Sequence, residues 1–222
     1  MRPHVAIIDP ASRVAEIDSL NRLQDTNDVK FTYHLPALYG MDSLNTLRTS
    51  IDGIIIFGSG ASVYDELPWQ GPMNYWLEPH IEKGTPILGL CYGHQLLAHL
   101  LGGKIGFVSE DQSKLVGLRK ITLLDKNDFW QGQKEGHFVV SHREHITKLP
   151  SDCEIMATSP ECEVDGFRHL KKPIWGMQSH PEAGPGFVDN QSLPMEKHES
   201  NFDSGELFLR KFISKIITNS KT

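Results

Sequence analysis

One cysteine in this sequence stands in a setting that favours nucleophilic chemistry. Cys91 lies between Gly89 and Gly93, directly after a short apolar run and directly before a segment with helical spacing of apolar residues. This order predicts a nucleophile elbow, a tight strand-to-helix turn that lifts a side chain out of a sheet. The helix N-terminus that follows favours the thiolate, which is the nucleophilic form. An isolated cysteine is most often only a buried side chain, and we interpret Cys153 and Cys162 in this way because they lack such a setting.

A cysteine nucleophile needs a base, and the base needs a group that orients it. The sequence offers His180, Pro181 and Glu182 just after an apolar run at 174–177. In parallel sheets, active-site groups gather at the carboxyl ends of the strands. Glu182 could accept a hydrogen bond from one imidazole nitrogen and leave the other for Cys91. Alone, this tripeptide would also fit a surface histidine beside a solvated glutamate, but its combination with the elbow favours a triad.

The first half of the chain alternates short apolar runs with segments of helical periodicity. We expect strands at 5–9, 29–34, 51–57 and 86–90, and helices at 13–23, 74–83 and 93–101. Pro79 interrupts the second of these helices or marks its boundary. Strands that alternate with helices predict right-handed βαβ units and a parallel sheet covered on both faces.

The second half of the chain has a different pattern. We expect strands at 115–124, 137–141, 153–158, 164–168 and 174–178, with no long helices between them. This spacing predicts an antiparallel or mixed portion. An amphipathic helix is expected at 206–217. The segment 183–198 contains two prolines and two glycines and shows little periodicity, so we interpret it as a loop or lid.

The segment from Gly89 to Gln95, together with His180-Pro181-Glu182, resembles the motifs of the class I (triad) glutamine amidotransferase family. The resemblance covers most of the chain, and within the family it points to the amidotransferase domain of GMP synthase and its stand-alone relatives. Further matching motifs occur in the expected order, namely Ser62-Val63-Tyr64-Asp65, Ser141-His142 and Leu149-Pro150. We therefore expect one domain over 1–222, with a three-layer, flavodoxin-like α/β fold whose mostly parallel central sheet carries an antiparallel or mixed portion.

The resemblance implies a role for each member of the triad. Cys91 is expected to attack the side-chain amide of glutamine and form a γ-glutamyl thioester. His180 is expected to act as the base and then as the acid, while Glu182 orients it. Ammonia leaves, and water hydrolyses the thioester to glutamate.

Further site residues follow from position and from the resemblance. The residue after a nucleophile commonly donates its backbone N–H to the oxyanion, so Tyr92 is the first expected donor. Alignment on the Ser-Val-Tyr-Asp motif places Ser59 where family members commonly carry the second glycine of Gly-Gly-Pro, so its backbone N–H is the second expected donor. The resemblance assigns glutamine recognition to Gln95 and to the backbone around Ser141 and His142.

Composition and motif spacing argue against several functional classes. The chain has 22 basic and 28 acidic residues and a net charge of −6, unlike the basic footprint of a nucleic-acid-binding protein. Its apolar runs are too short to span a membrane. The cluster His137, His142 and His145 matches no strong zinc spacing, and we expect neither a metal nor another cofactor. The three cysteines and the lack of a signal-peptide pattern indicate free thiols and a cytoplasmic location.

The fate of the ammonia stays open at this level. The sequence has no Gly-rich phosphate loop that could activate an acceptor with ATP. We therefore expect glutamine or a γ-glutamyl compound as substrate and a separate synthetase as partner. A stand-alone γ-glutamyl peptide hydrolase with the same triad is the alternative, in which the segment 183–198 would shape a pocket for a bulkier substrate. A non-catalytic regulatory protein on this scaffold is a third hypothesis, which the intact triad disfavours.

Overall fold

The computed structural model describes residues 2–26, 28–124, 129–130 and 132–219. Its central element is a nine-stranded sheet in the order β2-β1-β3-β4-β11-β10-β9-β6-β7. The first five of these strands run parallel: β2 (Lys30–His34), β1 (His4–Ile8), β3 (Gly53–Ile56), β4 (Ile87–Leu90) and β11 (Ile174–Met177). Every residue of β1, β3 and β4 is buried, as expected for parallel strands covered on both faces.

The other four strands of the sheet are antiparallel to their neighbours. They are β10 (Gly166–His169), β9 (Cys153–Thr158), β6 (Leu115–Leu123) and β7 (Glu135–His142). A separate antiparallel pair consists of β5 (Lys104–Phe107) and β8 (Glu144–Lys148). The predicted division into a parallel part and an antiparallel or mixed part is therefore confirmed.

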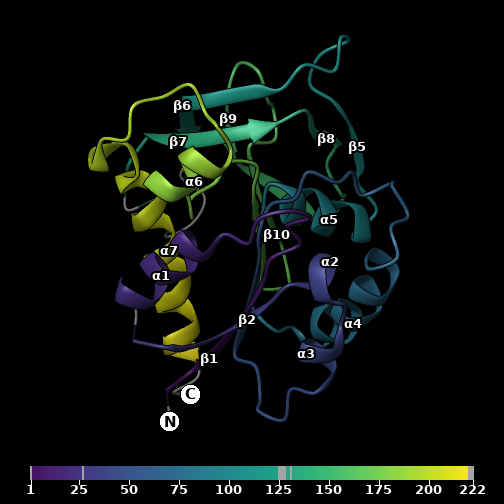
Figure 1. Cartoon of the computed structure of the whole chain (residues 1–222). Coiled ribbons are helices and arrows are strands. Elements are labelled where there is room, and N and C mark those ends of the chain that lie inside the picture. The colour runs from purple at the N-terminus through teal and green to yellow at the C-terminus, as the bar shows by residue number, and fades with distance from the viewer. Residues whose placement is uncertain (1, 27, 125–128, 131, 220–222) are drawn as a thin grey trace.

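Helices cover both faces of the sheet (Figure 1). One face carries α1 (Ile17–Thr26), α6 (Pro185–Asn190) and α7 (Asp203–Asn219); the other carries α2 (Pro36–Tyr39), α3 (Asp42–Asn45), α4 (Gln70–Lys83) and α5 (Tyr92–Leu100). Successive side chains of β3 point to opposite faces of the sheet, so they pack in two separate hydrophobic clusters. Ile55 packs in one cluster with Phe208 and Phe212 of α7, whereas Ile54 packs in another with Leu77 of α4. The predicted three-layer α/β fold is confirmed.

The segment 183–198 is not the irregular loop that its composition suggests. Residues Pro185–Asn190 form α6. Ala183, Phe187 and Val188 are buried and pack with Val139 of β7 and Phe202. The spacing of these three apolar residues is helical, and the prolines and glycines around it concealed that short pattern. The prediction of a loop or lid here is therefore wrong for its first half.

Two predicted helices begin four residues away from the expected start. The helix expected at 13–23 begins only at Ile17, because Asp9 accepts the backbone N–H of Glu16 at 2.9 Å and holds the preceding residues in a loop. The helix expected at 74–83 begins at Gln70 and continues through Pro79. Proline removes one helical hydrogen bond, to the carbonyl of Tyr75. That residue is 78% exposed, so water can satisfy its carbonyl.

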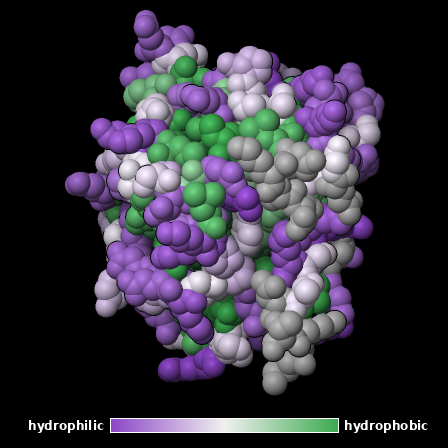
Figure 2. Space-filling model, turned by 180° about the vertical axis from the view of Figure 1, so that it is seen from behind, coloured by the Kyte–Doolittle hydropathy of each residue, from purple (hydrophilic) through white to green (hydrophobic). Residues whose placement is uncertain are grey.

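The strands β5 and β8 were missed because both are short and carry charged residues, at the start of β5 and at both ends of β8. On the face seen from behind, hydrophilic side chains cover most of the surface, and hydrophobic ones gather in its upper part (Figure 2). Among the described helices, none has the length and apolar character that crossing a membrane requires.

Candidate active site

Cys91 occupies a strained turn between β4 and α5. Its φ is 50° and its ψ is −102°, a conformation that non-glycine residues adopt only where the surrounding structure imposes it. The backbone N–H of Cys91 donates to the carbonyl of Met177 at 2.9 Å, and its own carbonyl accepts the N–H of Gln95 at 3.0 Å. The predicted elbow is therefore present, with the cysteine directly before the first residue of α5.

The two glycines that flank Cys91 are required by close packing. A Cβ on Gly89 would lie 2.2 Å from the carbonyl oxygen of Gly93. A Cβ on Gly93 would lie 2.5 Å from the carbonyl oxygen of Ile56 in β3. Both contacts are with backbone atoms, which cannot move aside as a side chain can. The sequence reasoning that assigned these glycines to tight packing is confirmed.

His180 follows β11, the strand next to β4, and it lies beside Cys91. Its Nδ1 is 2.8 Å from Oε1 of Glu182, and the two side chains are 5% and 1% exposed. A Cβ on Gly58 would lie 2.7 Å from Cε1 of His180 and 3.4 Å from Cβ of Cys91. The loop after β3 therefore touches both side chains. Because Nδ1 is engaged by Glu182, Nε2 is the nitrogen left for proton transfer.

The three cysteines differ in the charged groups and the burial around them, and the clearest sign at Cys91 is the pKa of its neighbour His180. Burial opposes a charge on His180, but Cys91 and Glu182 outweigh it and raise the pKa of that imidazole to about 10. Such a shift favours an imidazolium beside Cys91. By contrast, burial and the nearby Asp152 raise the pKa of Cys153 to about 12. Burial also raises the pKa of Cys162, so these two thiols are held in the unreactive neutral form.

The expected oxyanion residues lie on either side of Cys91. Tyr92 is the first residue of α5, and its buried hydroxyl accepts a hydrogen bond from Nε2 of Gln70 at 3.0 Å. Ser59 lies in the loop after β3, where its hydroxyl donates to the carbonyl of Pro10 at 2.8 Å. The Ser59 side chain thus joins this loop to the loop after β1, and it leaves the backbone as the group available to a substrate.

Two cavities meet at Cys91. The smaller has a volume of about 190 Å³, and the predicted residues Gln95, Ser141 and His142 all line it. The larger has a volume of about 610 Å³ and is lined by His180 and also by Ser141. The structure therefore brings the predicted recognition residues together beside Cys91, and of these two cavities the larger is the one that His180 also lines.

The wall of the smaller cavity is held by hydrogen bonds among the predicted residues. Nε2 of Gln95 donates to the carbonyl of Glu144 at 2.7 Å and to Oε1 of Gln178 at 3.2 Å. Nδ1 of His142 lies 3.0 Å from the same Glu144 carbonyl. Burial lowers the pKa of His142 to about 4, so this imidazole is neutral near pH 7.

Other residues around Cys91 were not found from the sequence. Lys114 and Arg143 line both cavities, and Glu16, Asn190 and Gln191 line the larger one. Arg143 lies inside the Ser-His motif, which was the one available signal. The other four lie far from any motif along the chain, and tertiary packing alone brings them here.

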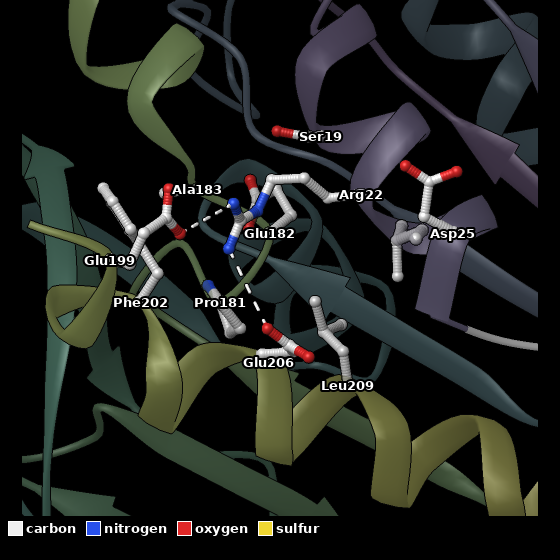
Figure 3. A pocket seen from close by; sticks show the side chains of 11 residues that line it. Ser19, Arg22, Asp25, Pro181, Glu182, Ala183, Glu199, Phe202, Glu206 and Leu209 are labelled. Atoms are coloured by element: carbon white, nitrogen blue, oxygen red, sulfur yellow. Dashed lines mark hydrogen bonds and ion pairs between the residues drawn. The ribbon is translucent and has the colours of Figure 1, made fainter. Parts of the chain in front are cut away.

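A third cavity of about 230 Å³ adjoins Glu182 from the side of α1 and α7 (Figure 3). Arg22 extends across it and pairs with Glu199 at 3.3 Å and with Glu206 at 3.9 Å. Neither Cys91 nor His180 lines this space, so it is separate from the two cavities at the elbow.

A parallel sheet that carries a cysteine on a strained elbow, next to a buried histidine–glutamate pair, defines a class of α/β proteins with a thiol at the carboxyl edge of the sheet. The model of the class-I glutamine amidotransferase family matches residues 21–197, and the chain belongs to this family. The resemblance seen in the sequence is thereby confirmed.

Comparison with individual proteins shows which members of this family the chain is similar to. The chain is 36% identical over 130 residues to a glutamine-hydrolyzing GMP synthase subunit from Pyrococcus furiosus, an alignment that covers 58% of this chain and 65% of that protein. It is 33% identical over 142 residues to the glutamine-hydrolyzing GMP synthase of Streptococcus pneumoniae, covering 64% of this chain but 26% of the longer protein. A glutamine amidotransferase from Thermotoga maritima superposes with a TM-score of 0.75 at 17% identity, over 98% of this chain and 99% of that one. At this identity, the likeness supports the fold alone.

Proposed function

We propose that this protein hydrolyses the side-chain amide of glutamine through a thioester on Cys91. The observation that carries the proposal is the position of Cys91 on its elbow, beside the buried His180–Glu182 pair and open to a cavity. The thiolate attacks the amide carbon, the carbon–nitrogen bond breaks, and His180 gives its proton to the leaving nitrogen, which departs as ammonia. Water then attacks the thioester, His180 takes a proton from it, and the Cys91 thiolate leaves to yield glutamate.

The other groups take supporting roles in this proposal. Glu182 holds Nδ1 of His180 and stabilises the imidazolium. The backbone N–H groups of Tyr92 and Ser59 stabilise the oxyanion of the tetrahedral intermediate. The wall formed by Gln95, Ser141 and His142 binds the glutamyl group in the smaller cavity. None of these steps needs a metal or another cofactor.

We further propose that the ammonia passes to a separate synthetase, which uses it in a GMP synthase-like reaction in the cytoplasm. The names of the relatives support this division of labour. The protein from Pyrococcus furiosus is named as one subunit of the enzyme, whereas the alignment with the Streptococcus pneumoniae protein covers about a quarter of a longer chain. A site that serves a partner should be slow alone, since free hydrolysis would waste glutamine. The loop of Ser59 is the part we expect docking to adjust, because an oxyanion donor is worth about 10²–10³ in rate.

The first experiment labels the nucleophile. The purified chain is treated with a diazo-ketone analogue of glutamine, and the labelled peptide is identified by mass spectrometry. We expect the label on Cys91, because it lies on the elbow beside His180, which can take the proton of its thiol. Label mainly on Cys153 or Cys162 would contradict the assignment.

The second experiment separates the partner model from its rivals. Ammonia release from glutamine is measured with and without a synthetase of the GMP synthase type. Release of glutamate from γ-glutamyl dipeptides is measured in parallel. We expect slow turnover of glutamine alone and faster turnover with the synthetase. Fast cleavage of a dipeptide without a second protein would establish the stand-alone hydrolase instead, and no turnover under any condition would favour the regulatory protein.

A further inference from the structure

The larger cavity extends from Cys91 past His180 to α6 and to the loop before α1. His180 lines this cavity and does not line the smaller one. Because the imidazole must hand its proton to the leaving nitrogen, that nitrogen lies on the His180 side of the cysteine. The leaving group of any amide cleaved here therefore occupies the larger cavity, and the acyl group occupies the smaller.

The larger cavity far exceeds what ammonia needs. Its volume is about 610 Å³, whereas a molecule of the size of water takes about 30 Å³ in the liquid. Cavities of roughly 300–1,000 Å³ are typical of sites for whole small molecules. The space on the leaving-group side therefore accommodates a substituted amine.

Glu16 gives this cavity a buried carboxyl group, which is negatively charged when ionised. Glu16 is 5% exposed. Its two carboxylate oxygens accept hydrogen bonds from Nδ2 of Asn190 at 3.3 Å and from Nε2 of Gln191 at 3.1 Å. Asn190 is the last residue of α6, and Gln191 follows it. This helix is tied to α1 because the backbone N–H of Gly186 donates to Oδ2 of Asp18 at 3.1 Å. Burial raises the pKa of Glu16, so a cationic ligand that offsets the loss of water would favour its charged form.

The basic groups around the cavity do not cancel this charge. Arg13, Lys114 and Arg143 also line it, but all three are exposed. Charges in contact with solvent are screened by water and salt, whereas a buried carboxylate is screened much less. Glu182, the other buried acidic group that lines the cavity, is already paired with His180. Glu16 is therefore the charge that a ligand deep in this cavity meets.

We propose that this cavity is a leaving-group subsite in which Glu16 selects amines that carry a second, cationic amino group. The inference rests on the proposed thioester function and extends its substrates from glutamine to mono-γ-glutamyl amides of short diamines. In this reaction Cys91 takes the γ-glutamyl group and the amide carbon–nitrogen bond breaks. His180 protonates the leaving nitrogen, the free diamine departs, and water converts the thioester to glutamate. Glu16 acts as a specificity-determining residue and pairs with the distal ammonium.

The test compares two amides of nearly equal size, γ-glutamyl-1,3-diaminopropane and γ-glutamyl butylamide, with glutamine as reference. Free glutamate is measured, and the readout is the ratio of kcat/KM for the diamine amide to that for the butylamide. A hydrogen-bonded charge pair predicts a ratio of about ten in favour of the diamine. Glu16→Gln, which keeps the shape and removes the charge, should bring the ratio close to one. Because both amides use the same triad, a general loss of activity cancels in this ratio.

Two controls keep the test decisive. Glu82→Gln removes an exposed carboxylate of α4 outside the three cavities described above and should leave the ratio unchanged. If Glu16→Gln fails to fold, inhibition of the wild-type protein is measured instead, and 1,3-diaminopropane should inhibit at about tenfold lower concentration than butylamine. Turnover of glutamine and of both amides with a ratio near one would overturn the subsite and leave the thioester function intact. No turnover of any of the three, with or without the synthetase, would overturn both.

Discussion

The parallel and antiparallel parts of the sheet contribute differently to the site. Cys91 and His180 follow β4 and β11, which are adjacent and paired in register from Ile87 and Ile174 onward. Their side chains therefore emerge at one edge from a buried, doubly covered region. Ser141 and His142 belong instead to β7, at the far edge of the sheet. From this contrast we infer that the parallel part holds the reacting atoms, while the antiparallel part contributes one wall of the cavities.

The largest expected effect is the loss of the thiol. Cys91→Ala should lower glutamine hydrolysis by about 10⁶-fold, the scale seen when a protease nucleophile is removed, because no other group can form the thioester. Ammonia release is the measurement, and circular dichroism checks the fold. Cys153→Ala in the antiparallel part is the matched control and should keep nearly full activity. Normal ammonia release by a folded Cys91→Ala protein would rule out the thioester mechanism.

The second prediction ranks the two partners of the cysteine. His180→Ala should be more damaging than Glu182→Gln, because the imidazole moves the proton whereas the carboxylate only orients and stabilises it. The loss for Glu182→Gln should still be on the order of 10⁴-fold, as for the orienting residue of a related triad. Single-turnover thioester formation, followed by mass spectrometry, measures both. Full activity in both variants would show that the histidine–glutamate pair is only structural.

The features set by local sequence were predictable. The buried runs around Ile54 and Leu88 and the glycines at Gly89 and Gly93 indicated the parallel sheet and the elbow, because strand burial and backbone contact leave few other residue types possible. The motif also indicated the family. The position of β11 beside β4 could not be derived from periodicity, since the chain returns there only after the four antiparallel strands of the same sheet.

The residues that line the larger cavity could not be predicted from the sequence, for a different reason. Glu16 lies 164 residues before His180 in the chain, and Asn190 lies ten residues after it. Only the docking of α6 on α1 brings these side chains together. The mixed composition around α6 hid the buried apolar residues Ala183, Phe187 and Val188, and the prediction of a loop there was wrong. Long-range packing, rather than local preference, determines this side of the site.

The third prediction compares a glycine in each part of the sheet. Gly89→Ala should lower the free energy of unfolding by about 3 kcal/mol, because its new Cβ would meet the backbone of Gly93 at 2.2 Å. Gly136→Ala in β7 should cost only about 1 kcal/mol, because its nearest contact, at 2.7 Å, is the ring edge of Phe138. A side chain can shift where backbone cannot. Urea denaturation of both variants measures the difference, and equal costs would show that the elbow is no more tightly packed than the edge of the sheet.

The smallest expected effect tests the role of the antiparallel part in binding. Ser141 lines both cavities, so Ser141→Ala removes at most one hydrogen bond to the substrate while the triad stays in place. A neutral hydrogen bond contributes about 1 kcal/mol, which corresponds to a rise of about fivefold in KM with little change in kcat. Steady-state kinetics with glutamine separate the two constants. Ser214→Ala on α7, where the hydroxyl donates to the carbonyl of Arg210, is the control and should change neither. A large fall in kcat for Ser141→Ala would instead mean that β7 contributes to the transition state, and the division between reacting atoms and binding wall would have to be abandoned.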